Sequence, residues 1–578
     1  MKVDKIKHIN DYYQKVQKIF HTIMFKIRFC LLIGILPLQI QAQDKVLDAM
    51  KTEANRSLAI FKEEPVPAYY ISYRIQDKET FSVATRFGKL QSNNQRREGF
   101  YRMMIRVGNH EMDNTRKVGF RSDADGIFGE FPSASYLPIE EDPFALRMKL
   151  WENVNETYRY AVREYERIKT TVGVNAEVSD QSDDFTHEIP EQYYEAPLGL
   201  KFDAQKWEKK LKMYSQVFDN NKDLLEGSAN LNVELVRNYF VDTDGAVIAQ
   251  NRCAFRLSLT VRTIADDGMV LPLYQSYFSM EEKDLPSDAA VIADAQKISK
   301  LASQLKNAPV AESYSGPAIM SSKASGVFFH EIFGHRIEGA RMKQESDAQT
   351  FKKKVGEAVL PEDISVIFDP QLKKYRGMQL SGSYVFDDEG VRGKRVMVVE
   401  NGVLKSFLMS RTPIDGFPKS NGHGRGDVKH DPETRQSNML IESSNPKSDG
   451  ELRNMLISEI KRTGKEYGYL FDEVSGGFTS TGRFTPNAFN VTPLVVYRIY
   501  ADGRPDELVR GIDLIGTPLS MFSQVVACGN QYDVFNGYCG ATSGSIPVSC
   551  VSPSLFVKMI ETQKKSKSTS KPPVLERP

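Results

Sequence analysis

Two histidines and a glutamate lie together in an apolar segment, residues 326–339, and this segment constrains the chain more than any other. Glu331 directly follows His330, and His335 comes four residues later. Neutral imidazoles are good zinc ligands, and a carboxylate beside them is placed to take a proton from metal-bound water. Only eight histidines occur in 578 residues, and an unpaired carboxylate in an apolar helix is costly. These facts favour a metal site over a buried helix with two hydrogen-bonded histidines.

The spacing between the two histidines is five residues, whereas the familiar zinc-peptidase helix spaces its histidines four apart. Five residues of a regular α-helix rotate by about 140°, which turns the imidazoles away from each other. We therefore predict a local π-type bulge between His330 and His335, with Gly334 supplying the backbone freedom. A catalytic zinc usually has three protein ligands, and spacing does not choose a third among the candidates Glu338, His423, His430, Cys528, Cys539 and Cys550.

The segment resembles the HExxxH motif of the TldD/PmbA family of peptidases, also called modulator-of-gyrase proteins. The resemblance continues through further segments: 387–393 (DDEGVRG), 400–405 (ENGVLK), 422–425 (GHGR), 435–438 (RQSN), 514–516 (LIG) and 539–548 (CGATSGSIPV). It covers about residues 310–557, with a weaker match in residues 233–260. Three features depart from the family pattern: a predicted export signal at the N-terminus, which is described below, the added N-terminal length, and Phe333 within the motif.

The resemblance implies roles for individual residues. The zinc ligands would be His330, His335 and Cys539, with one zinc per subunit, and Glu331 would activate a zinc-bound water that attacks a peptide carbonyl. Because these four residues are present, the chain is similar to the active type of subunit in the family. Five further residues are expected to contact substrate: Glu338, His423, Arg425, Arg435 and Asn438. For Glu338 the alternative is a supporting role beside the metal ligands.

The pattern along the chain, together with the resemblance, predicts an α+β fold of two domains. Apolar periodicity predicts helices over 46–63, 146–169, 202–218 and 286–305, and strands over 68–73, 231–240 and 247–264. We expect an N-terminal α/β domain over 43–307 and a strand-rich C-terminal metallopeptidase domain over 308–562, which carries the HExxxH helix. Residues 563–578 are rich in Lys, Ser and Pro and are expected to be a disordered tail.

The N-terminus resembles an export signal. Lys26 and Arg28 precede an apolar run of about ten residues, 29–38, which is too short to span a membrane and suits a signal-peptide core. We expect Met24 to be the functional start and cleavage to follow Ala42, so residues 1–42 are assigned to an extension and signal peptide. A buried N-terminal helix is the alternative. No later stretch reaches membrane length, so the mature protein is expected to be periplasmic or secreted, with no stable membrane span.

Charge and cysteine content exclude two further classes. The chain has 76 Lys+Arg and 75 Asp+Glu, a net charge of +1, which argues against nucleic acid as a partner. Five cysteines in so long a chain exclude a disulfide framework. Cys30 leaves with the signal peptide, and Cys253, Cys528 and Cys550 are expected to be small buried side chains.

Three functional hypotheses follow. The leading one is an exported zinc peptidase that acts on peptides or unfolded segments, as a homodimer or as a heterodimer with a paralogous subunit. The second is a non-catalytic peptide-binding or assembly subunit with a structural metal, which normally has four protein ligands. The third is a metal-dependent hydrolase of another bond, such as an amide in a cell-wall fragment.

Overall fold

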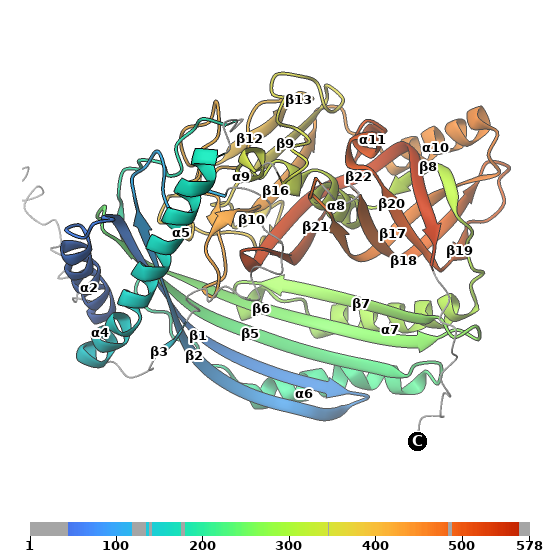
Figure 1. Cartoon of the computed structure of the whole chain (residues 1–578). Coiled ribbons are helices and arrows are strands. Elements are labelled where there is room, and N and C mark those ends of the chain that lie inside the picture. The colour runs from blue at the N-terminus through green and yellow to red at the C-terminus, as the bar shows by residue number, and fades with distance from the viewer. Residues whose placement is uncertain are drawn as a thin grey trace, which may run out of the picture.

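The computed structural model describes residues 44–117, 135–137, 142–174, 180–344, 346–483 and 488–565. The predicted signal peptide, with its Met24 start and Ala42 cleavage site, lies outside these residues, as do positions 566–578 of the predicted tail. Two large sheets with helices packed on them form the molecule, so the predicted α+β class is confirmed (Figure 1). Among the helices of the described ranges, none is both long and apolar enough to cross a membrane.

The N-terminal part is built on a seven-stranded sheet with the order β3-β2-β1-β5-β6-β4, in which β7 also pairs with β6. All pairs are antiparallel except β4 with β6. The strands are β1 (Ala68–Arg86), β2 (Lys89–Val107), β3 (Ser135–Leu137), β4 (Gln192–Tyr194), β5 (Glu226–Asp242), β6 (Val247–Ile264) and β7 (Val270–Ser279). The predicted strand over 247–264 is confirmed, whereas β1 and β5 extend well beyond their predicted ends.

Helices cover this sheet in two groups, which are separated in Figure 1. The first group packs on β1 and β2 and comprises α2 (Lys45–Phe61), α4 (Pro143–Glu152) and α5 (Val154–Val174). The second packs on the other end of the sheet, in a core that also includes residues of β18 (Phe489–Tyr500) and β19 (Glu507–Val509), and comprises α6 (Ala204–Gln216) and α7 (Asp288–Asn307), with the 3-10 turns η1 (Val217–Asn220) and η2 (Glu282–Asp284). The apolar stripes that predicted α2, α6 and α7 are the faces buried here.

The single helix predicted over 146–169 is wrong, because the chain forms two helices that meet at Asn153. Asn153 leaves helical geometry, with φ −101° and ψ 4°. Its side-chain amide donates hydrogen bonds to Tyr101 Oη at 2.8 Å and to Ser135 Oγ at 2.9 Å. These partners lie on β2 and β3, outside the predicted helix, so helical periodicity on both sides of Asn153 does not reveal the break.

The C-terminal part is built on an eleven-stranded sheet with the order β13-β12-β9-β16-β22-β20-β18-β17-β8. Because β8 also pairs with β22, the strands β22, β20, β18, β17 and β8 form a closed ring. The strands are β8 (Tyr314–Met320), β9 (Ile364–Phe368), β12 (Val396–Glu400), β13 (Val403–Leu404), β16 (Asn438–Ser443), β17 (Tyr467–Thr479), β18 (Phe489–Tyr500), β19 (Glu507–Val509), β20 (Ile512–Gly516), β21 (Val525–Ala541) and β22 (Gly544–Lys564). The tail predicted from residue 563 therefore begins too early, because Lys564 still pairs with Ile512.

Shorter elements complete this half. Two small hairpins pair β10 (Lys374–Tyr375) with β11 (Met378–Gln379), and β14 (Gly424–Arg425) with β15 (Glu433–Thr434). The helical elements are α8 (Ser322–Ile332), the 3-10 turn η3 (Gly334–Arg336), α9 (Ala340–Lys343), α10 (Asp449–Thr463) and α11 (Pro518–Phe522). α10 begins with a capping box formed by Ser448 and Glu451, and it ends at Gly464, which has φ +65°.

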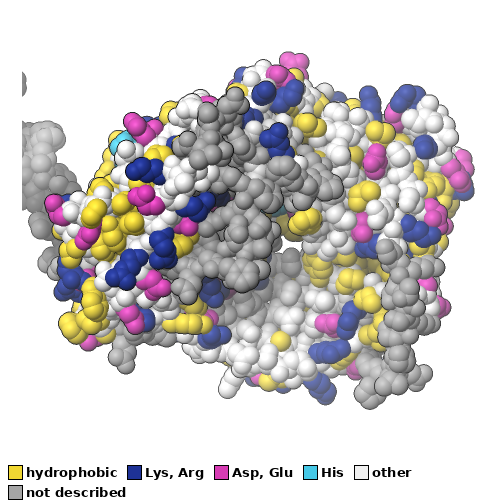
Figure 2. Space-filling model, in the orientation of Figure 1, with side chains coloured by type: hydrophobic (Ala, Val, Ile, Leu, Met, Phe, Trp, Pro, Cys, Tyr) yellow, Lys and Arg dark blue, Asp and Glu magenta, His cyan; other side chains and the backbone are white. Residues whose placement is uncertain are grey.

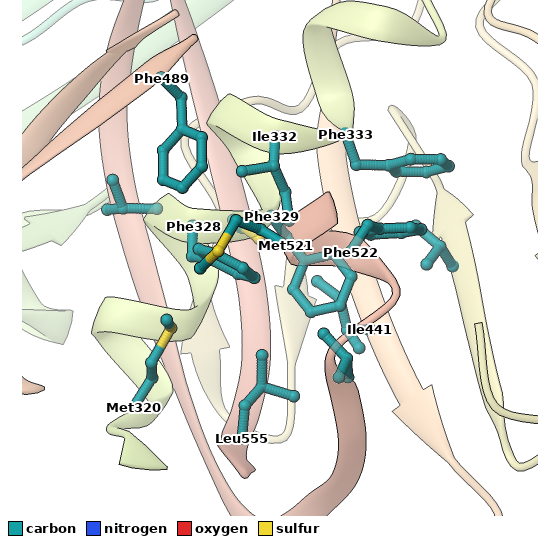
Figure 3. Close-up of a cluster of buried hydrophobic side chains, with 14 of the residues drawn as sticks. Met320, Phe328, Phe329, Ile332, Phe333, Ile441, Phe489, Met521, Phe522 and Leu555 are labelled. Carbon is teal, nitrogen blue, oxygen red and sulfur yellow. The ribbon is translucent and has the colours of Figure 1, made fainter. Parts of the chain in front are cut away.

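The helix α8 lies in the main hydrophobic core, where it contacts β17, β18, β21 and β22. Figure 3 shows the aromatic residues of this helix packed among side chains from β8, β16, β18, β22 and α11. Phe333 stacks on Phe522, with ring centroids 4.9 Å apart and an interplanar angle of 8°. The residue that departs from the family motif therefore anchors the end of α8 in the core.

Charged side chains of both signs are mixed over the face that Figure 2 displays, as the net charge of +1 predicts. The described cysteines Cys253, Cys528, Cys539 and Cys550 carry free thiols. Cys528 and Cys550 are buried, as expected, and burial raises the pKa of both thiols. Cys253 lies on β6 and is only partly buried.

Candidate metal centre

The helix that carries His330 and Glu331 ends at Ile332, three residues before His335. Ser321 caps its N-terminus by accepting a hydrogen bond from Ala324 N. After Ile332 the chain leaves the α-helix at Phe333 and continues as the 3-10 turn η3. The predicted π-type bulge is therefore wrong: the end of the helix, rather than a wider turn within it, brings His335 back toward His330. The two imidazole centroids are 4.9 Å apart.

Gly334 packs closely at this turn against a residue that is distant in the sequence. A Cβ at this position would lie 2.0 Å from Oε1 and 2.7 Å from Nε2 of Gln436. The chain therefore passes close against the Gln436 amide, and a side chain at position 334 would displace it. The predicted role of Gly334 in backbone freedom is not borne out by its φ, which lies outside the left-handed region; close packing against Gln436 is the constraint at this position.

Cys539 completes a group of three buried donors. It lies near the end of β21, and its Sγ is 3.3 Å from His335 Nε2. One donor atom from each of His330, His335 and Cys539 lies within 4.8 Å of the others. In a tetrahedral zinc site, bonds of about 2.1 Å to nitrogen and 2.3 Å to sulfur place these atoms about 3.6 Å apart. The three residues therefore fit a zinc ion. Among the described residues, the chain supplies this one His/Cys/carboxylate group of metal-binding size.

The charges of the group suit a cation. Burial alone would raise the pKa of the Cys539 thiol, but the neighbouring His335 and His330 imidazoles bring that pKa well below its ordinary value. Burial acts to lower the pKa of His335, yet Cys539 and Glu338 raise it to about 10. The lowered pKa of Cys539 favours the thiolate, which is the form of this side chain that binds a metal cation.

Glu331 lies beside the donors and is buried. Burial raises its pKa above the ordinary carboxyl value, although the two histidines act to lower it. Gly477 of β17 packs directly against it: a Cβ there would lie 2.5 Å from Glu331 Cγ and 2.8 Å from Oε1. Sequence reasoning missed Gly477, although a glycine pair at 476–477 inside a strand pattern signals a close approach.

Glu338 supports His335 from behind and has no exposed surface. Its carboxylate lies 3.2 Å and 3.4 Å from His335 Nδ1, and Arg341 Nε donates to it at 2.7 Å. The Nδ1–H of His335 therefore faces Glu338, which leaves Nε2 for Cys539 and the metal. His335 and Arg341 lower the pKa of Glu338 to about 2 against the effect of its burial.

The other four residues predicted to contact substrate are buried and bonded to protein groups. His423 Nε2 contacts Ser437 Oγ at 3.0 Å, and Arg425 donates to the Gln436 carbonyl. Asn438 donates to the carbonyls of Asp369 and Leu372 at 2.9 Å. Arg435 donates to the Cys539 carbonyl at 2.6 Å, so it alone of the four touches a predicted metal ligand.

The family is decided by a match over the domain that holds this centre. Residues 313–564 match the family model described as the PmbA/TldA metallopeptidase C-terminal domain. This match places the C-terminal domain of the chain in the TldD/PmbA family. The match includes His330, Glu331, His335 and Cys539.

Curated relatives agree with this assignment. A metalloprotease of Archaeoglobus fulgidus is 31% identical over 266 residues, which are 46% of this chain and 57% of the relative. A zinc metalloprotease TldD homolog of Saccharolobus solfataricus is 24% identical over 332 residues, 56% of this chain and 68% of the relative. The chain spans about half the length of the first curated relatives that it matches.

The fold is similar beyond the region of sequence similarity. The crystal structure of TldE from Thermococcus kodakarensis superposes with a TM-score of 0.58 at 14% identity. The superposition covers 89% of this chain and all of TldE, so both halves of the molecule share the TldE fold.

Proposed function

We propose that the protein is a zinc-dependent peptidase that hydrolyses peptide bonds in peptides or unfolded segments. The observation that carries the proposal is the placement of Glu331 beside three buried donors, His330, His335 and Cys539, that fit one zinc ion. A catalytic zinc keeps a coordination position open, whereas a structural zinc is closed by four protein ligands. Three donors within the described ranges favour the catalytic alternative over the non-catalytic one.

In the proposed mechanism, the zinc ligands, Glu331 and Gly477 have different roles. A bound zinc would polarise the scissile carbonyl and acidify the attacking water. Glu331 accepts the proton of that water at a carboxylate oxygen and delivers it to the leaving nitrogen. Its raised pKa brings its proton affinity closer to the working range of a general base. Gly477 leaves the space that this carboxylate occupies.

Export and assembly belong to the same proposal. The apolar run over 29–38 and the small residue Ala42 support export to the periplasm or the medium. The family resemblance supports a dimer, either of two copies or with a paralogous subunit. Mass measurement on the mature protein distinguishes these assemblies.

The test is metal analysis joined to peptide-library cleavage, on the mature protein and its Glu331→Gln variant. The wild type is expected to hold one zinc per subunit and to lose cleavage on chelation. Glu331→Gln is expected to keep its zinc and to lose about a thousandfold in kcat, because removal of a general base costs about 10²–10⁴. Full cleavage by the variant would remove Glu331 from the mechanism, and a wild type without metal would contradict the proposal as a whole.

A further inference from the structure

Two of the proposed zinc ligands are far apart in the sequence, yet their donor atoms lie 3.3 Å apart. His335 is on the 3-10 turn after α8, and Cys539 is near the end of β21, 204 residues later. A single contact between two side-chain atoms does not fix the orientation of the elements that carry them. Other groups must hold the two elements in register.

Arg435 holds the turn that follows Cys539. Its guanidinium is fully buried and donates to three acceptors around the β21–β22 turn: Cys539 O at 2.6 Å, Ser543 Oγ at 2.7 Å and Gly544 O at 3.2 Å. A planar group with five donors is needed to reach all of them, and a lysine ammonium does not have that geometry.

Glu338 continues this arrangement to His335. Its Oε1 lies 3.8 Å from Arg435 Nε and 3.2 Å from His335 Nδ1. Within the described part of the chain, neither Glu338 Oε1 nor Arg435 Nε has an aligned hydrogen bond. Both atoms are fully buried. The contact between them is therefore electrostatic, and through it Glu338, which contacts His335, is linked to Arg435, which contacts the Cys539 main chain.

We propose that Glu338 and Arg435 are positioning residues that together hold His335 and Cys539 at ligating distance. The contacts close a ring, from His335 Nδ1 through the Glu338 carboxylate and the Arg435 guanidinium to the Cys539 main chain, and back from Sγ to His335 Nε2. The inference rests on the proposed function in one respect, namely that the ligands bind a metal. It assigns to Arg435 and Glu338 a role behind the ligands instead of contact with substrate.

The experiment measures zinc affinity by chelator competition for Glu338→Gln, Arg435→Lys and the double variant. Each single change is expected to weaken zinc binding by about 10–100-fold, the range seen when a group behind a ligand is removed. Because either change opens the ring, the double variant is expected to bind zinc about as weakly as the weaker single variant. Ser543→Ala removes one anchor of Arg435 and is expected to cost only a few-fold.

Spectroscopy distinguishes a positioning role of Glu338 and Arg435 from a purely structural one. With Co²⁺ in place of zinc, the thiolate charge-transfer band reports whether Cys539 is bound, and we expect it to weaken in Glu338→Gln and Arg435→Lys. Matched controls are Glu53→Gln and Arg411→Lys, which alter buried ion pairs that contain none of the metal ligands. They are expected to lower the melting temperature of the metal-free protein and to leave the zinc affinity and the band unchanged.

Two results would overturn the proposal. One is wild-type zinc affinity and an unchanged Co²⁺ spectrum in both single variants. The other is a double variant whose loss is the product of the two single losses, because independent contributions do not form a ring. Should Arg435→Lys fail to fold, Ser543→Ala decides, since unchanged affinity there contradicts the anchoring of the turn. A wild type that binds no metal contradicts the proposed function instead.

Discussion

Asp113 and Glu338 are two fully buried carboxylates, each with an arginine at hydrogen-bonding distance, and they differ in how they are satisfied. Asp113, in the N-terminal part, accepts from Tyr69 Oη and Arg106 Nη1 at one oxygen and from Thr115 N and Oγ1 at the other. Glu338 accepts from Arg341 at Oε2, while its Oε1 has no aligned donor among the described residues.

The difference distinguishes a structural carboxylate from one that serves a site. Burial acts against both charges, yet Arg106 keeps the pKa of Asp113 below its ordinary value, as His335 and Arg341 do for Glu338. Asp113 uses all of its acceptor capacity to hold the local fold. Glu338 Oε2 accepts from Arg341 and also contacts the imidazole of the metal ligand His335, and Oε1 lies 3.2 Å from the same imidazole, so this carboxylate acts on the metal centre.

The comparison is tested most strongly by Asp113→Asn. The change leaves the Arg106 charge buried without its partner, so we expect the free energy of unfolding to fall by about 3 kcal/mol. Zinc affinity should stay within about twofold of the wild type. Denaturant unfolding of the metal-free protein and chelator competition measure the two quantities.

Glu338→Gln is the counterpart of this variant. We expect it to weaken zinc binding more than Asp113→Asn does and to lower the free energy of unfolding less. The comparison fails if Asp113→Asn weakens zinc binding as much as Glu338→Gln does. Such a result would mean that the two buried carboxylates form one network.

A smaller effect is expected from Gly477→Ala, which tests whether kcat depends on the exact position of the Glu331 carboxylate. The added methyl would lie 2.5–2.8 Å from Glu331 atoms, so the carboxylate has to move. We expect kcat to fall about tenfold with unchanged zinc affinity. Gly450→Ala is the control, because a Cβ there meets nothing within 4 Å. Full activity of Gly477→Ala would show that the carboxylate tolerates displacement.

The regular parts of the fold were predictable from local patterns. The strand β6 and the helix α7 have clear periodicity and polar ends, so their predicted limits lie close to the observed ones. The break at Asn153 and the end of α8 at Phe333 depend on contacts with other elements, and periodicity does not report such contacts.

The centre was predictable only in part. His330, Glu331 and His335 are neighbours in the sequence, so the residues alone suggested a metal site. Cys539 was assigned through the family resemblance, because no spacing rule connects it to a helix 204 residues away. The contacts of Arg435 with Cys539 and of Gly477 with Glu331 arise from the packing of distant strands, which a single sequence does not encode locally.

The most direct test of the account is X-ray absorption at the zinc edge of the metal-loaded mature protein. We expect one sulfur at about 2.3 Å, two imidazole nitrogens at about 2.0 Å and one light-atom ligand from outside the chain. The sulfur should disappear in Cys539→Ser. A shell of four protein ligands, or a zinc shell without sulfur in the wild type, would contradict the three-donor catalytic centre.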